Sequence, residues 1–171
     1  MTNAIHVPRA LQSFMSGQDE SIPGPESPIE EKLIFLQSNM VSFVKQYQLP
    51  IIEVSLVVSK YLRILTDSLV EKANMYDEKI PDNLLESNPI DAESVEPIFL
   101  DFPLESLVNK VDQDRMDIFD TILRTSINRT ELPFPQAIAL LRDWEVIVRT
   151  QLSRATSPGH LFSPLDIPEG F

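Results

Sequence analysis

The chain has 171 residues, a mass of 19.4 kDa and a formal net charge of −12. It contains no cysteine, which excludes disulfides, thiolate metal sites and cysteine nucleophiles. The acidic balance repels nucleic acid phosphates and therefore disfavours direct binding of DNA or RNA.

Residues 1–26 are expected to form an extended N-terminal arm, because Pro23, Gly24 and Pro25 interrupt any periodic pattern near its end. The arm lacks the long apolar stretch of a secretory signal. No run of about 18 apolar residues predicts a membrane span anywhere in the chain. We therefore expect an intracellular (cytoplasmic) protein, or a virion component if the source is viral.

The first helix is predicted over about residues 28–47. Ser27 as N-cap, Pro28 at the first helical position and Glu30 two residues later form the pattern of a capping box. Apolar residues recur at helical spacing on one face, while Ile34 and Val41 make a second, narrow stripe. Two stripes indicate contact with two neighbours, or with one neighbour and a partner.

The second helix is predicted over about 50–76, beginning at Pro50. Its apolar residues cover more than half of the circumference, which indicates a central helix or an oligomer interface; the core reading is favoured. Five charged residues fall on one stripe of this helix: Glu53, Lys60, Arg63, Asp67 and Glu71. The acidic connector over 77–102 follows, and its length predicts that it packs over the helices or binds a partner.

Two further helices are predicted over about 103–128 and 135–154, and their short link makes them antiparallel neighbours. Arg115 falls in the apolar face of the first of these helices. A side chain that snorkels to the rim is favoured there over a buried ion pair, which would require a carboxylate partner.

The only tryptophan, Trp144, lies in the centre of the apolar stripe of the last helix. Arg142, Glu145 and Arg149 fall on the opposite face, where Glu145 can pair with either arginine. Trp144 is therefore predicted to be a core residue rather than a binding platform.

No pattern points to catalysis. Asp112, Asp114, Asp117 and Asp120 do not converge on a helix, and the glycine and closing glutamate of a calcium loop are missing. The only histidines, at positions 6 and 160, lie in the predicted arms. We expect a solvated acidic face, no catalytic residues, no metal site and no cofactor.

Large apolar residues occur where no regular helix accounts for them, in the connector and in the C-terminal arm over 155–171. Such residues are unusual in solvated disordered segments, so these segments either dock on the chain's own helices or bind a partner groove. The predicted protein-binding residues are Ile98, Phe99, Leu100, Phe102, Leu161, Phe162, Leu165, Ile167 and Phe171.

The fold is predicted to be all-α: a bundle of about four helices within residues 27–154, with an acidic, proline-rich insertion and extended N- and C-terminal arms. The expected function is that of a non-enzymatic interaction or assembly subunit, with a structural, adaptor or assembly-chaperone role in a larger complex, including a viral or phage one. Its partners would be proteins, as a homo-oligomer or a larger assembly. The alternative is an acidic regulatory cofactor that binds a basic partner such as the transcription machinery.

Overall fold

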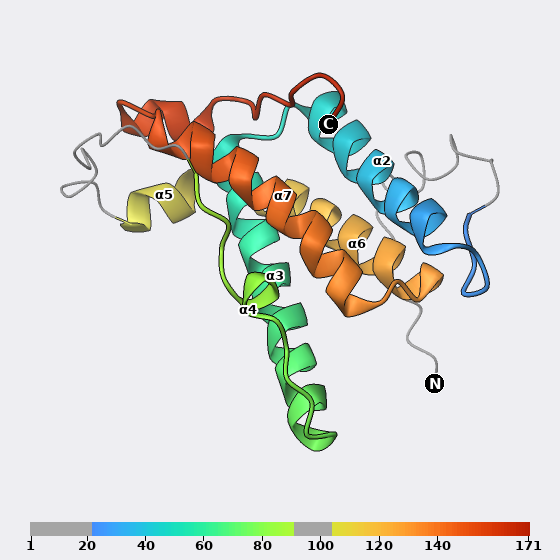
Figure 1. The fold of residues 1–171 in the computed structure, drawn as a ribbon. Helices are drawn as coiled ribbons and strands as arrows, with labels where there is room; N and C mark the ends of the chain where they lie inside the picture. The colour runs from blue at the N-terminus through green and yellow to red at the C-terminus, as the bar shows by residue number, and fades with distance from the viewer. Residues whose placement is uncertain (1–21, 91–103) are drawn as a thin grey trace, which may run out of the picture.

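The computed structural model describes residues 22–90 and 104–171 and is all-α, as predicted (Figure 1). In the described part of the chain, the only β contact is an isolated bridge between Pro50 and Pro164. The helical elements, the last of them a 3-10 helix, are α2 (Ile29–Tyr47), α3 (Ile51–Met75), α4 (Asp82–Leu85), α5 (Leu104–Lys110), α6 (Gln113–Thr130), α7 (Phe134–Ser153) and η1 (Pro158–Phe162).

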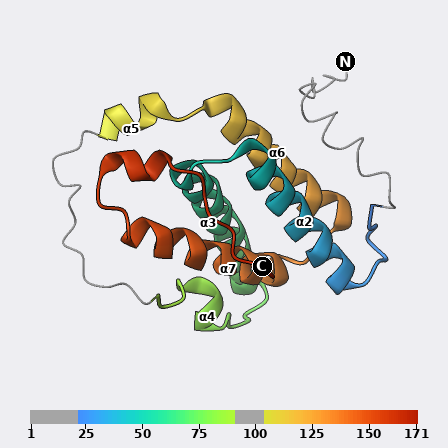
Figure 2. The ribbon, with the colours of Figure 1, turned by 90° about the horizontal axis from the view of Figure 1, so that it is seen from above.

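The core lies between the four long helices. α3 packs against α7 and α6, and α2 packs against α6 and α7, an arrangement visible from above in Figure 2. Phe43 of α2 stacks on Phe119 of α6 with ring centroids 5.8 Å apart. Trp144 is fully buried, which confirms its predicted place in the core. Burial of each such side chain stabilises the fold by about 1.5–3 kcal/mol.

Two tight corners join these helices without glycine. Gln48 after α2 and Glu131 after α6 adopt the left-handed conformation, with φ of 48° and 52°. The next residues, Leu49 and Leu132, donate their backbone N–H groups back to the helices that have just ended and are buried. A left-handed residue followed by a buried apolar residue is a common way for a helix to end. The burial of the leucine side chain offsets the free-energy cost of the left-handed backbone.

The predicted capping box at the start of α2 is wrong. Pro28 is the N-cap, and the Ser27 hydroxyl instead accepts a hydrogen bond from the backbone N–H of Gly24 at 3.1 Å. Pro50 and Pro133 likewise precede α3 and α7 as N-caps. A proline suits this position because its carbonyl accepts the first helical hydrogen bond while no N–H is left without a partner. These helices therefore begin one residue after the proline.

The single helix predicted over 103–128 is also wrong, because the structure divides it into α5 and α6. Asp112 has an extended backbone, and its carboxylate accepts a hydrogen bond from the backbone N–H of Arg115 at 3.0 Å. Aspartate favours this capping geometry over the interior of a helix. A new helix consequently begins after Asp112.

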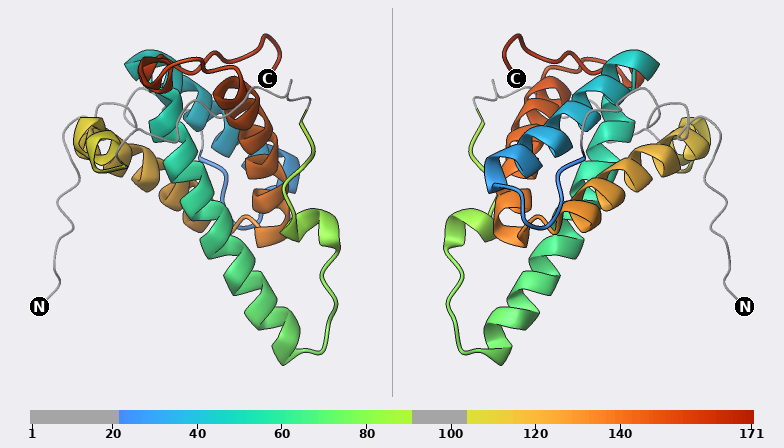
Figure 3. Two further views of the ribbon diagram at one scale, coloured as in Figure 1. Left: turned by 90° about the vertical axis from the view of Figure 1, so that its left-hand side faces the viewer. Right: turned by 90° about the vertical axis from the view of Figure 1, so that its right-hand side faces the viewer.

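The C-terminal half of α3 extends beyond the other helices and forms the lower end of the molecule in Figures 1 and 3. The chain then returns through α4, which packs against α7. Among residues 22–90 and 104–171, no helix is long and apolar enough to cross a bilayer.

Candidate protein-interaction surfaces

The predicted protein-binding residues divide into two groups. Ile98, Phe99, Leu100 and Phe102 lie outside the described residues. The C-terminal five are described: Leu161 and Leu165 are buried, Phe162 is half-buried, and Ile167 and Phe171 pack against the core. Phe171 meets Trp144 edge to face, with ring centroids 5.1 Å apart.

Backbone hydrogen bonds hold this C-terminal segment against the corner between α2 and α3. Ile51 donates its N–H to the carbonyl of Ser163, and Leu165 donates its N–H to the carbonyl of Leu49, both at 2.9 Å. The bond from Ile51 satisfies one of the N–H groups that the first turn of α3 leaves without a helical partner. The segment thus docks on the chain's own helices, while a role in binding a partner stays a prediction.

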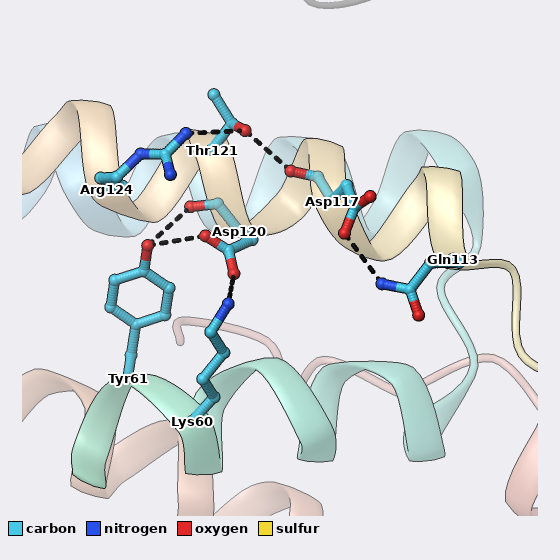
Figure 4. A network of polar contacts seen from close by, with 7 residues as sticks. All are labelled: Lys60, Tyr61, Gln113, Asp117, Asp120, Thr121 and Arg124. Carbon is cyan, nitrogen blue, oxygen red and sulfur yellow. Dashed lines mark hydrogen bonds and ion pairs between the residues drawn. The ribbon is translucent and has the colours of Figure 1, made fainter. Parts of the chain in front are cut away.

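Two aspartates of α6, Asp117 and Asp120, contact neighbouring side chains (Figure 4). Asp120 accepts a hydrogen bond from the Tyr61 hydroxyl at 2.7 Å and forms an ion pair with Lys60, and so links α6 to α3. Asp117 accepts a bond from Gln113 at 2.8 Å. Burial and the bond to Asp120 raise the pKa of Tyr61 well above its ordinary value. In the described ranges, no group of three or more potential metal ligands comes together.

The preference for a snorkelling Arg115 is wrong. The guanidinium of Arg115 donates to both carboxylate oxygens of Glu53, at 3.0 and 2.5 Å. Glu53 is fully buried, whereas the Arg115 side chain keeps 29% of its surface exposed. The hydrogen bonds to Glu53 raise the pKa of Arg115. This bidentate pair joins α3 to α6 and neutralises the buried carboxylate.

The charged face of α7 is covered by the first part of the connector. Arg142 pairs with Glu145 at 3.1 Å, as predicted, but it is buried and also donates to the carbonyl of Leu84 at 3.2 Å. Arg149 donates to the carbonyl of Asn88 at 2.6 Å. The connector follows α7 because these guanidinium groups supply donors to its free carbonyls.

A cavity of about 490 Å³ lies between the end of α7 and the C-terminal segment. Arg154, His160 and Asp166 are its charged or titratable lining residues. The His160 Nδ1 atom accepts a hydrogen bond from the backbone N–H of Thr156 at 3.0 Å. Since His160 and Asp166 are both exposed, this cavity offers a solvated rim rather than a desolvated catalytic centre.

A second hollow, here called the α3 groove, has a volume of about 430 Å³ and lies between α3 and the turn from α6 to α7. Leu69 and Lys72 line it from α3, Leu132 lines it from the turn, and Phe134 lines it from the first position of α7. The Lys72 ammonium lies 5.6 Å from the centroid of the Phe134 ring, which is within the range of a cation–π contact.

Exposed apolar side chains also lie in the C-terminal part of α3 and at its end. Val70 is partly exposed, and Met75 and Tyr76 at the end of the helix each keep 73% of their surface exposed. Only an indirect signal in the sequence points to this region, namely a set of apolar residues on the second predicted helix that is wider than one packing face needs. Helical periodicity cannot show which part of that set extends beyond the neighbouring helices.

Comparison of the chain with protein-family models, with curated proteins and with solved structures finds no match.

Proposed function

We propose that this protein is a non-enzymatic interaction or assembly subunit, acting as a structural component, adaptor or assembly chaperone in a larger complex. Its four long helices would serve as a rigid bundle, with residues 77–102 as an acidic insertion and with arms over 1–26 and 155–171. The observation that carries this proposal is the C-terminal half of α3, which extends beyond the bundle, exposes large apolar residues at its end and lines the α3 groove through Leu69 and Lys72.

The exposed residues at the end of α3 are costly for an isolated monomer. Met75 and Tyr76 expose large apolar surfaces to water, beyond Ala73, which is the last buried residue of α3. A solvated continuation of that helix would normally carry polar residues on every free face. Large exposed apolar side chains at the end of the helix instead favour contact with another protein.

The chemistry of the α3 groove fits an apolar protein segment. Leu69, Leu132 and Phe134 offer apolar walls, and the contact of Lys72 with the Phe134 ring places a cation at one side. A partner would fill the groove with a large apolar side chain and place a carboxylate beside Lys72. Apolar anchors of this kind supply most of the binding energy at protein interfaces.

The ion pairs of the core support a non-catalytic role. Glu53 is neutralised by Arg115, and Asp120 is held by Lys60 and Tyr61. These carboxylates fix helices to one another and do not face an open cleft where a substrate could reach them.

Site-specific photo-crosslinking in the native source tests the proposal. A photoreactive residue at position 72 should give a discrete crosslinked partner, identified by mass spectrometry, while the same residue at exposed position 38 of α2 should not. Phe134→Ala should weaken the crosslink at least about tenfold, whereas the matched change Phe35→Ala, on α2 and outside the groove lining, should leave it intact. Equal crosslinking from both positions, or no effect of Phe134→Ala, would overturn the proposal.

A further inference from the structure

One face of α3 is exposed over almost the whole length of the helix. Its residues, here called the outer stripe, are Leu56, Lys60, Ile64, Asp67, Glu71 and Met75, and all of them are exposed. At roughly 100° per residue they fall within about 100° of the helix circumference. Leu69 and Lys72 of the α3 groove lie outside this arc, so the outer stripe is a separate surface.

The outer stripe is nearly symmetrical about its own centre. Successive members are separated by four, four, three, four and four residues. A two-fold axis that crosses α3 between Leu65 and Thr66 therefore exchanges Leu56 with Met75 and Lys60 with Glu71. In an antiparallel pair of helices, an apolar side chain would meet an apolar one and an ammonium group would meet a carboxylate.

The centre of the outer stripe departs from this one-to-one exchange, because the axis places Ile64 level with Asp67 of the second copy. Arg63, which is exposed beside Ile64, lies one residue from that level and would pair with Asp67 of the second copy, while the two Ile64 side chains would lie on either side of the axis. A surface that is complementary to itself in this way is what a two-fold interface requires.

Local charge balance distinguishes the outer stripe from the rest of the molecule. The chain carries a net charge of −12, so two copies repel each other over most of their surfaces. Within the outer stripe, Lys60 and Arg63 balance Asp67 and Glu71. In the described part of the chain, Arg63, Asp67 and Glu71 make no ion pair, while Lys60 pairs with Asp120 and keeps 54% of its side chain exposed.

The apolar members make the outer stripe more than a solvated charged face. Leu56 is 44% exposed, Ile64 is 45% exposed and Met75 is 73% exposed. We propose that two copies of this chain associate through the outer stripe, with their α3 helices antiparallel about a two-fold axis near Leu65 and Thr66.

Charge exchange at the centre of the interface tests this proposal on the full chain. Light scattering and sedimentation over a range of protein concentrations should show a dimer. Arg63→Glu alone and Asp67→Arg alone should each weaken self-association at least about tenfold, because each places like charges opposite one another. An equimolar mixture of the two variants should associate again, since every facing pair is then of opposite sign.

A cysteine at the axis gives an independent measurement, because the chain contains no cysteine. Ile64→Cys should form a disulfide between copies much faster than Ile34→Cys, which lies at an exposed position of α2. Phe134→Ala should leave the dimer unchanged, so failure of the groove proposal and failure of this one can be told apart. A monomer at all concentrations, a mixture that does not associate, or equal rates for the two cysteine variants would overturn the dimer.

Discussion

At the scale of single residues, the pair formed by Glu53 and Arg115 is the polar contact on which the core depends most. A buried carboxylate is tolerated only when its charge is matched, and the bidentate geometry provides that match at a point where α3 and α6 cross. Neither residue could be assigned a partner from the sequence. A helical wheel shows the direction of a side chain but not which side chain of another helix faces it.

The ion pair between Glu53 and Arg115 predicts an order of stability for two variants that a loss of packing alone would not produce. Arg115→Met should destabilise the protein by about 3 kcal/mol, because it leaves the Glu53 charge buried without a partner. Adding Glu53→Met to that variant should recover part of the loss, although it removes a second native side chain. Denaturant unfolding of the two variants checks this order, and a double variant less stable than Arg115→Met would contradict it.

The buried hydroxyl of Tyr61 should make the free energy of unfolding fall as the pH becomes alkaline. Its pKa is raised in the folded protein by burial and by the bond to Asp120, so it keeps its proton at a pH where an unfolded tyrosine, with a pKa of 10.0, loses it. The stability contributed by the protonated hydroxyl is fully present below pH 10 and is lost as the pH rises toward the folded pKa.

The measurement is the denaturation midpoint between about pH 9 and about pH 11. The midpoint of the wild-type protein should fall over this interval, and Tyr61→Phe should fall less steeply. Tyr76→Phe is the matched control because Tyr76 is largely exposed, and it should retain the slope of the wild type. Equal slopes in all three proteins would contradict the role given to Tyr61.

At the scale of elements, periodicity predicts where helices form better than it predicts where they break. The apolar stripe through Trp144 identifies the core face of α7, and the structure buries that face as predicted. The break before α6 was missed because the apolar spacing continues through it while the capping bond of Asp112 ends the helix. A local hydrogen bond decided the boundary, and hydrophobic periodicity carries no record of such a bond.

The first part of the connector, residues 77–90, should be held on α7 by the hydrogen bond from Arg149. Arg149→Gln removes the donor that holds the carbonyl of Asn88, and a charged hydrogen bond of this kind contributes about 1.5–3 kcal/mol. Amide exchange within α4 should therefore become at least about tenfold faster, while the global unfolding free energy changes little. Arg129→Gln, at an exposed position of α6, should change neither quantity. Unchanged exchange in α4 would show that other contacts hold the connector.

At the scale of the whole molecule, the last residues of the chain complete the core that the helices begin. The sequence identified Leu161, Leu165 and Phe171 as apolar residues in need of burial but left open whether the chain itself or a partner buries them. Sequence alone could not decide, because docking depends on a surface that exists only once α2, α3 and α7 have packed together. Leu165 then pairs with the corner at Leu49 and Phe171 meets Trp144.

Because the C-terminal segment docks on the helices of its own chain, substitutions at Leu165 and Phe171 should lower the unfolding free energy of the isolated chain by different amounts. Leu165→Ala should cost about 2–4 kcal/mol, since it opens a cavity in the core, whereas Phe171→Ala should cost about 1 kcal/mol and shift the emission of Trp144, the only tryptophan. Glu169→Ala, at an exposed position between them, should change neither stability nor emission. If the segment were instead reserved for a partner, Leu165→Ala would leave the unfolding free energy of the isolated chain unchanged, because the side chain would then contribute nothing until the partner bound.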